Sequence, residues 1–410
     1  MKSPTPALLQ SPTPTLPQME GVADVSPFPW GRVGVGLFCL FLCGCITEYN
    51  PTGLDEIADI LVVEGIITDD ESYITLSRSV NLTVGENSIT SKQFVNNATV
   101  SVECDDGTRS VGYFEYIDYK NARYVINTGT LNPERQYQLK IEVEEAYYPG
   151  ANRSSISLPT KTFEYRSDFS YPIQTPEIDS VFWTKRGKGQ NVMIYVATND
   201  PAGKIQYYRW SFKEDWEYTA DVFLAGFPFY CWDKDNDREL LLGSAERTVF
   251  GKVTEMITEI SPTSRKLSEL YRIDITQNVI SKRAYDYFAN IKKNAQQTGS
   301  IFTPIPSELR GNITCITDPG RPVIGYIDVS TTTKKRRFIP YSERVYESFW
   351  SRECEIVDEP TLIEIYGGIP YDYVLYSPPY PGQPATYVLY KCVACTYYSG
   401  TDQKPGDWPK

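Results

Sequence analysis

Much of the chain alternates apolar and polar positions with a period of two, which is typical of β-strands that bury one face. The alternation is clearest over Ala98–Glu103, which runs into the turn Asp105-Asp106-Gly107, and over Tyr137–Val143. Similar runs predict further strands at 60–67, 73–79, 113–119, 123–126, 178–183, 191–196, 206–212, 271–276 and 323–329. The close spacing of the early strands predicts an all-β sandwich over 60–165, of the immunoglobulin-like or transthyretin-like kind.

One segment near 281–298 has a helical period instead. Ser281 is a suitable N-cap, and Gly299 stands where a left-handed glycine often ends a helix. The apolar residues between them recur at helical spacing and form one stripe: Ala284, Phe288, Ile291 and Ala295. We therefore expect a mainly β chain, in which residues 166–410 form a second β-rich domain with at least one inserted α-helix.

A short apolar run at 33–45 is the membrane-seeking segment of the sequence. A helix needs about 20 apolar residues to cross a bilayer, so this run has the length of an export signal instead. It ends in Leu42-Cys43-Gly44-Cys45, and a branched residue three positions before a cysteine preceded by glycine resembles a bacterial lipoprotein box.

This ending predicts that residues 1–44 are a lipoprotein-type signal peptide, over-extended relative to a start at Met19. Cleavage would leave Cys45 at the new N-terminus with acyl chains on its thiol, and each buried CH₂ of such a chain contributes about 0.8 kcal/mol to membrane binding. The polar residues 45–59 would form a tether. The alternative is a secretory signal with an incidental cysteine.

Composition removes several classes of function. The chain has 40 basic and 52 acidic residues and a formal net charge of −12, which argues against nucleic acid as a partner. The basic run Lys334–Arg337 is most simply a solvated strand edge. The sequence contains no histidine, which removes Ser-His-Asp and Cys-His catalysis and most zinc sites.

Carboxylates remain as candidate chemistry, but no catalytic residue, metal ligand or cofactor site can be named from them. Asp233–Asp237 has the alternating spacing of a calcium loop, yet Arg238 stands where glycine is needed and Ser244 where a bidentate glutamate is needed. We interpret it as an acidic turn. Glu142, Glu144 and Glu145 are interpreted as an outward strand face.

Six cysteines follow the proposed anchor, and export favours disulfides among them. Cys104 is interpreted as a lone buried thiol. The disulfide candidates lie in the C-terminal half: Cys231, Cys315, Cys354, Cys392 and Cys395. Cys392 and Cys395 form a C-x-x-C motif whose strand-like neighbours favour structural disulfides over a redox centre or a zinc site.

Several motifs occur in an order that resembles a known family: Leu61–Thr68, Cys231-Trp232, Ile280–Phe288, Gly299–Pro306, Gly311–Ile313, Val323–Tyr326 and the terminal C-x-x-C motif that leads to Lys404–Trp408. Together they resemble the Bacteroidota lipoproteins grouped as domain-of-unknown-function family 4249, over essentially all of 45–410. The resemblance implies an outer-membrane lipoprotein, on the cell surface rather than the periplasmic face, that accompanies a TonB-dependent receptor. It carries no catalytic residues.

The resulting hypothesis is a non-enzymatic accessory or ligand-binding lipoprotein in nutrient uptake, with a small molecule, peptide or glycan as its unidentified ligand. One alternative is a carboxylate-dependent hydrolase of the glycosidase kind, which would need two carboxylates about 5–10 Å apart in an aromatic cleft. The other is a structural surface or adhesion lipoprotein.

Overall fold

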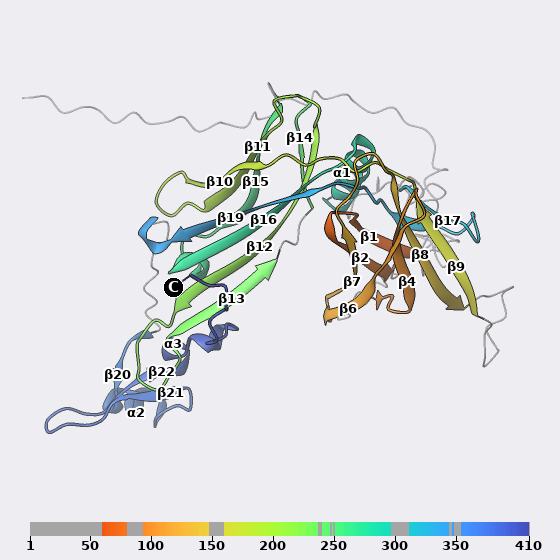
Figure 1. Ribbon diagram of the computed structural model, residues 1–410. Helices are drawn as coiled ribbons and strands as arrows, with labels where there is room; N and C mark the ends of the chain where they lie inside the picture. Colours follow the sequence, from red (N-terminus) through yellow and green to blue (C-terminus); the bar gives the residue numbers. More distant parts are fainter. Residues whose placement is uncertain are drawn as a thin grey trace, which may run out of the picture. The chain divides into compact units, whose positions relative to one another are not determined.

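The computed structural model describes residues 60–79, 93–146, 160–236, 240–246, 248, 251–296, 311–343, 347 and 354–409. All of them fall within one compact unit, Leu54–Lys410. In these residues the backbone forms five β-sheets and three α-helices (Figure 1). The predicted β-rich fold is therefore confirmed.

Two sheets face each other in an N-terminal sandwich. The first has the order β18-β1-β2-β7-β6, with β3 paired to β2, and its strands are β1 (Leu61–Ile66), β2 (Asp70–Arg78), β3 (Gln93–Phe94), β6 (Tyr113–Asp118), β7 (Asn121–Gly129) and β18 (Val323–Gly325). The second has the order β17-β9-β8-β4-β5, and its strands are β4 (Ala98–Cys104), β5 (Arg109–Val111), β8 (Tyr137–Ala146), β9 (Thr160–Ser167) and β17 (Ile313–Cys315).

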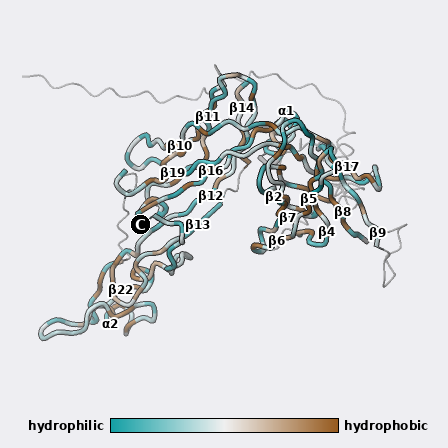
Figure 2. Tube along the Cα trace, viewed as in Figure 1, coloured by the Kyte–Doolittle hydropathy of each residue, from teal (hydrophilic) through white to brown (hydrophobic). Residues whose placement is uncertain are grey.

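The sandwich core is built by the alternation that the sequence shows. Val63 and Ile74 of the first sheet are buried with Val100, Ile141 and Phe163 of the second, all at 2 % exposure or less. Figure 2 shows hydrophobic positions along these strands separated by hydrophilic ones, as expected when one face of each sheet is buried and the other is exposed to solvent.

Two of the sandwich strands, β17 and β18, come from the sequence range that we assigned to the second domain. β18 pairs in parallel with β1, and β17 pairs with β9, so the chain returns to both sheets. A very close backbone approach makes this return possible, because a Cβ atom added to Gly311 would lie 1.5 Å from the carbonyl oxygen of Gly325. Only glycine fits there.

The second β-rich region contains a three-stranded and a five-stranded sheet. Their orders are β10-β11-β15 and β13-β12-β16-β19, with β14 paired to β12. The strands are β10 (Ile178–Lys185), β11 (Val192–Asn199), β12 (Tyr207–Thr219), β13 (Tyr230–Asn236), β14 (Leu241–Ser244), β15 (Lys252–Ile260), β16 (Leu270–Val279) and β19 (Thr332–Pro340). Their shared core includes Trp210, whose indole N–H donates to Gln277 Oε1 at 2.8 Å.

Two predictions about this region can be compared with the structure. The interpretation of Asp233–Asp237 as an acidic turn is wrong over Asp233–Asn236, because these residues belong to β13, which pairs with β12. The basic run Lys334–Arg337 does lie in a strand, β19, which occupies one edge of its sheet.

The predicted helix is present as α1 (Lys282–Gln296). Ser281 Oγ accepts the backbone N–H of Ala284 at 3.2 Å, as an N-cap should. The backbone N–H of Ser281 in turn donates to Asp328 at 2.6 Å. Ala284 packs with Ile66 of the sandwich and Tyr207 of β12, so the helix contacts both β-regions.

The C-terminal part adds a small sheet of order β20-β22-β21. Its elements are β20 (Val357–Asp358), α2 (Glu359–Tyr366), β21 (Tyr373–Ser377), β22 (Thr386–Leu389) and α3 (Tyr390–Val393). Short 3-10 helices are η3 (Arg265–Leu267), η5 (Tyr341–Glu343) and η7 (Cys395–Tyr398). Within the described ranges, every helix is too short or too polar to cross a lipid bilayer.

Candidate binding site

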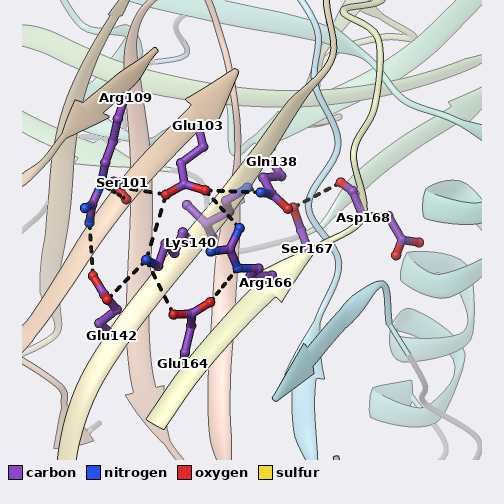
Figure 3. A network of polar contacts seen from close by, with 11 residues as sticks. Ser101, Glu103, Arg109, Gln138, Lys140, Glu142, Glu164, Arg166, Ser167 and Asp168 are labelled. Atoms are coloured by element: carbon purple, nitrogen blue, oxygen red, sulfur yellow. Dashed lines mark hydrogen bonds and ion pairs between the residues drawn. The ribbon is translucent and has the colours of Figure 1, made fainter. Parts of the chain in front are cut away.

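The outer face of the second sandwich sheet carries a dense network of charged side chains (Figure 3). Lys140 Nζ of β8 lies 3.1 Å from a carboxylate oxygen of Glu142 and 3.4 Å from one of Glu164. Arg166 of β9 donates hydrogen bonds to Glu164 and to Glu103 of β4, at 2.5 and 3.0 Å. The cations that pair with these carboxylates therefore come from the same strand, from a neighbouring strand or, in the case of Arg166 and Glu103, from across β8.

These contacts determine what the network can do chemically. The hydrogen bond from Arg166 lowers the pKa of Glu164. Burial raises the pKa of Glu142, but hydrogen bonds from Lys140 and Arg109 outweigh it, and the net shift is downward. A general acid needs a pKa raised toward neutrality. The network therefore joins strands across the sheet and does not supply an acid–base pair.

A second cluster of charges is buried at the other end of β8. Glu145 is 8 % exposed and accepts hydrogen bonds from Arg78 of β2 and from Arg321. Arg321 Nε also donates to the hydroxyl of Tyr165 at 2.9 Å. Burial, helped by the nearby charge of Glu145, raises the pKa of Tyr165 to about 12. The interpretation of Glu145 as part of an outward face is therefore wrong, whereas Glu144 is exposed.

Two neighbouring hollows lie on the outer face of the first sandwich sheet, and Thr75 lines both of them. The first has a volume of about 590 Å³, and its walls are mainly apolar: Val62, Tyr73, Tyr287, Phe288, Ile291 and Ile324. The second has a volume of about 520 Å³, and its walls are mainly polar, with charged residues that include Asp118, Lys120, Arg123, Lys213, Asp215 and Lys234. Volumes of this size suit a small ligand. We call the two hollows together the groove.

Cations and aromatic rings lie together on the walls of the groove. The guanidinium of Arg123 lies 3.9 Å from the ring centroid of Tyr73, and that of Arg209 lies 4.9 Å from the centroid of Phe288. Such pairs hold long side chains in place through cation–π attraction. The groove therefore has preformed flat surfaces at its apolar end and fixed charges at its polar end.

The carboxylates of the groove are already engaged. The side-chain amide of Asn121 donates to Asp118 and is the main cause of its lowered pKa. Asp215 accepts a hydrogen bond from Arg272 at 2.9 Å. Glu214 lines the same hollow and accepts from the hydroxyl of Tyr271 on its buried side. These groups stabilise the walls, and the lowered pKa of Asp118 is the opposite of what a general acid requires.

Four of the five disulfide candidates pair as expected for structural bridges. Cys231 bonds to Cys395, and Cys354 bonds to Cys392. The two cysteines of the C-x-x-C motif therefore have different partners. One bridge joins β13 to η7, and the other joins the segment before β20 to α3. Cys354 and Cys392 also lie close to Asp221, but their sulfurs are bonded to each other and cannot serve as thiolate metal ligands.

The fifth candidate, Cys315, forms no disulfide, so this expectation is wrong. It is buried in the sandwich core on β17. The other free cysteine among the described residues is Cys104, which is buried on β4. Because β9 and β8 separate their strands in the sheet, they lie about 14 Å apart at 4.8 Å per strand, too far for a bond. Cys45 lies outside the described residues.

Comparison with known proteins identifies the family. The family model of a domain of unknown function (DUF4249) matches residues 46–336, which is most of the chain. The chain belongs to this family. The DUF4249 match begins at the residue after Cys45 and ends within β19, so it is narrower than the resemblance that we inferred, which ran to the C-terminus. No curated protein matches the chain.

Two features of the structure escaped the sequence analysis. The buried position of Glu145 gives no local signal, because its two arginine partners come from distant segments. The groove was also missed, since its walls come from β1, β2, β12 and α1 together. Phe288 and Ile291 were predicted as part of the apolar stripe of the helix, and the same two residues line the apolar end of the groove.

Proposed function

We propose that this protein is a non-enzymatic lipoprotein of the outer membrane that binds a ligand and serves as accessory partner of a TonB-dependent receptor in nutrient uptake. The groove carries the binding part of this proposal. It combines an apolar, aromatic end with a charged end, which is the usual composition of a site that orients a small molecule, peptide or glycan.

The anchoring part of the proposal is supported by the lipoprotein-box motif that ends at Cys45. The DUF4249 match begins at residue 46, directly after Cys45, as expected if the mature chain starts at Cys45. A lipid chain on Cys45, followed by the tether 45–59, would hold the folded body at the membrane. We propose the cell surface as its location.

The non-enzymatic part is supported by the bonding of the groove carboxylates. A carboxylate-dependent hydrolase needs one carboxyl group that is protonated near neutral pH and another that is free to attack or to activate water. Asp118 and Asp215 are instead held by hydrogen bonds from Asn121 and Arg272.

The decisive test of the accessory role uses the anchor. Full-length protein with Cys45→Ala should leave the membrane fraction, take up no labelled palmitate and no longer co-purify with a TonB-dependent receptor. The control Cys43→Ala lies in the same motif and should behave as the wild type. A wild-type protein that is soluble and unlabelled, or anchored without any such receptor, would refute the proposal.

The groove can be tested although its ligand is unidentified. Native mass spectrometry of protein taken from its own membranes should show an adduct that is lost in Thr75→Trp, which fills the point shared by the two hollows. The control Thr99→Trp places the same side chain on the exposed face of β4 and should retain the adduct. An adduct retained in both variants would show that the ligand binds elsewhere.

A further inference from the structure

Residues 354–393 form a small unit that we call the terminal subdomain. It contains β20, α2, β21, β22 and α3, and the disulfide Cys354–Cys392 closes it. Its core is thin: Val388 and Val393 are buried, with Leu224 and Phe227 packed against them. The subdomain lies beyond the range matched by the DUF4249 model.

The helix of this subdomain is well defined but shows an unusual distribution of apolar residues. Asp358 caps α2 by accepting the N–H of Thr361 at 2.9 Å, and Gly367 ends it in the left-handed conformation with φ 75°. Leu362 is its one buried residue. The apolar side chains that follow are exposed by 36–102 % and form what we call the terminal patch: Ile363, Ile365, Tyr366, Ile369, Tyr371 and Leu375.

The helix side and the strand side of the terminal patch are in contact. The ring centroid of Tyr366 lies 6.5 Å from that of Tyr373 on β21. Leu375 follows two positions later in the same strand and therefore projects from the same face as Tyr373. Scattered single apolar residues are normal on a protein surface, but six exposed ones within thirteen consecutive residues of a small subdomain are an unusual concentration, which is typical of an interaction site.

Charge narrows the choice of partner. Residues 354–391 contain five carboxylates and one lysine, a net charge of −4. Glu364 lies between two isoleucines of the patch, and Asp372 follows Tyr371 directly. An anionic lipid surface would repel this rim, and so would a second copy of the same surface.

We propose that the terminal patch docks a partner protein through an apolar surface rimmed by lysine and arginine. This inference deepens the proposed accessory role, in which the receptor would be that partner. The disulfide and the two helix ends fix the patch before binding, so little conformational entropy is lost when it docks. The isoleucines and tyrosines supply the buried contacts, and Glu364 and Asp372 supply orientation.

The test is site-specific photo-crosslinking of the full-length, lipidated protein in its own cells. A photoreactive amino acid replaces Tyr371, which is fully exposed, or Tyr116 of β6, a control tyrosine that is 63 % exposed. The Tyr371 position should form an adduct whose partner peptide contains apolar residues flanked by lysine or arginine. Ile365→Ser and, separately, Glu364→Lys should each lower the yield by about tenfold, since both residues are exposed and neither is needed for folding.

The other outcomes each decide the question. Adducts with lipid, with a second copy or with another segment of the same chain would overturn the inference, as would equal yields at Tyr371 and Tyr116 or a higher yield with Glu364→Lys. If a TonB-dependent receptor co-purifies but Tyr371 does not crosslink to it, the surface is wrong and the accessory role stands. If Tyr371 crosslinks to a different protein with a basic rim, the surface stands and the accessory role fails.

Discussion

Replacing Glu145 by glutamine should destabilise the sandwich strongly, because it removes the one carboxylate that two arginines share. Glu145 is 8 % exposed and binds Arg78 and Arg321, while Arg321 is also held by Tyr165. Removing one partner of a buried ion pair costs about 3–5 kcal/mol, because the group that remains loses its main opposite charge. The same substitution at the neighbouring Glu144, which is exposed, should change stability by less than about 0.5 kcal/mol.

The assay must report on the sandwich alone. No tryptophan lies between residues 60 and 167, so tryptophan fluorescence follows the other regions of the protein. Hydrogen exchange measured by mass spectrometry on peptides from β2 and β8 is therefore the suitable readout. At about 1.4 kcal/mol per tenfold change, the loss predicts exchange through global opening that is about 150- to 4,000-fold faster in Glu145→Gln.

Equal exchange protection of β2 and β8 in Glu145→Gln and Glu144→Gln would contradict this prediction. That result would mean that the two arginines are well solvated in the folded protein and that the pair contributes no more than a surface salt bridge. A large effect of Glu144→Gln would likewise contradict the assignment of the two side chains to opposite faces of β8.

Three further predictions follow from the structure. Burial raises the pKa of Asp328 in the folded protein above its pKa in the unfolded chain, so its negative charge lowers stability once the pH exceeds the unfolded-state pKa. Asp328→Asn should therefore stabilise the protein at pH 7 and not at pH 3, as measured by denaturation midpoints. The hydrogen bond from Arg166 lowers the pKa of Glu164 in the folded protein, so the charged carboxylate stabilises the fold above its unfolded-state pKa, and this stabilisation is lost as the pH falls through the folded-state pKa. Glu164→Gln should therefore lower the free energy of unfolding by up to about 1 kcal/mol at pH 7 and not at all at pH 3. Replacing Cys354 and Cys392 by serine should abolish exchange protection in β21 and β22 but leave the sandwich strands protected.

The sequence predicted most of the strands because their burial is local information. Where one face is buried, as over Ala98–Cys104 and Tyr137–Val143, alternation alone locates the strand. β13 was misassigned because Asp233 and Asp235 resemble a turn, although pairing with β12 across seven positions holds them extended. β21 lies in the Pro- and Tyr-rich stretch 370–384, where no strand was predicted; it pairs with β22, and the disulfide Cys354–Cys392 closes the loop that contains both strands.

The candidate sites were harder to predict because they depend on distant contacts. Arg321 reaches Glu145 across 176 positions of sequence, so no window of local sequence could reveal that the carboxylate is buried. Cys315 resembled the other C-terminal cysteines by position, yet the return of β17 to the sandwich separates it from them. The terminal patch could not be predicted either, because an isoleucine in a helix normally indicates a buried face, whereas these isoleucines are exposed.

We propose that Cys45 carries the lipid that holds a receptor-bound folded body at the outer membrane. Mass spectrometry of the N-terminal peptide from membrane-extracted protein tests this most directly. We expect a mature chain that begins at Cys45 and bears a diacylglycerol on its thiol. A chain that begins at another residue, or an unmodified Cys45 in protein from the membrane fraction, would contradict it.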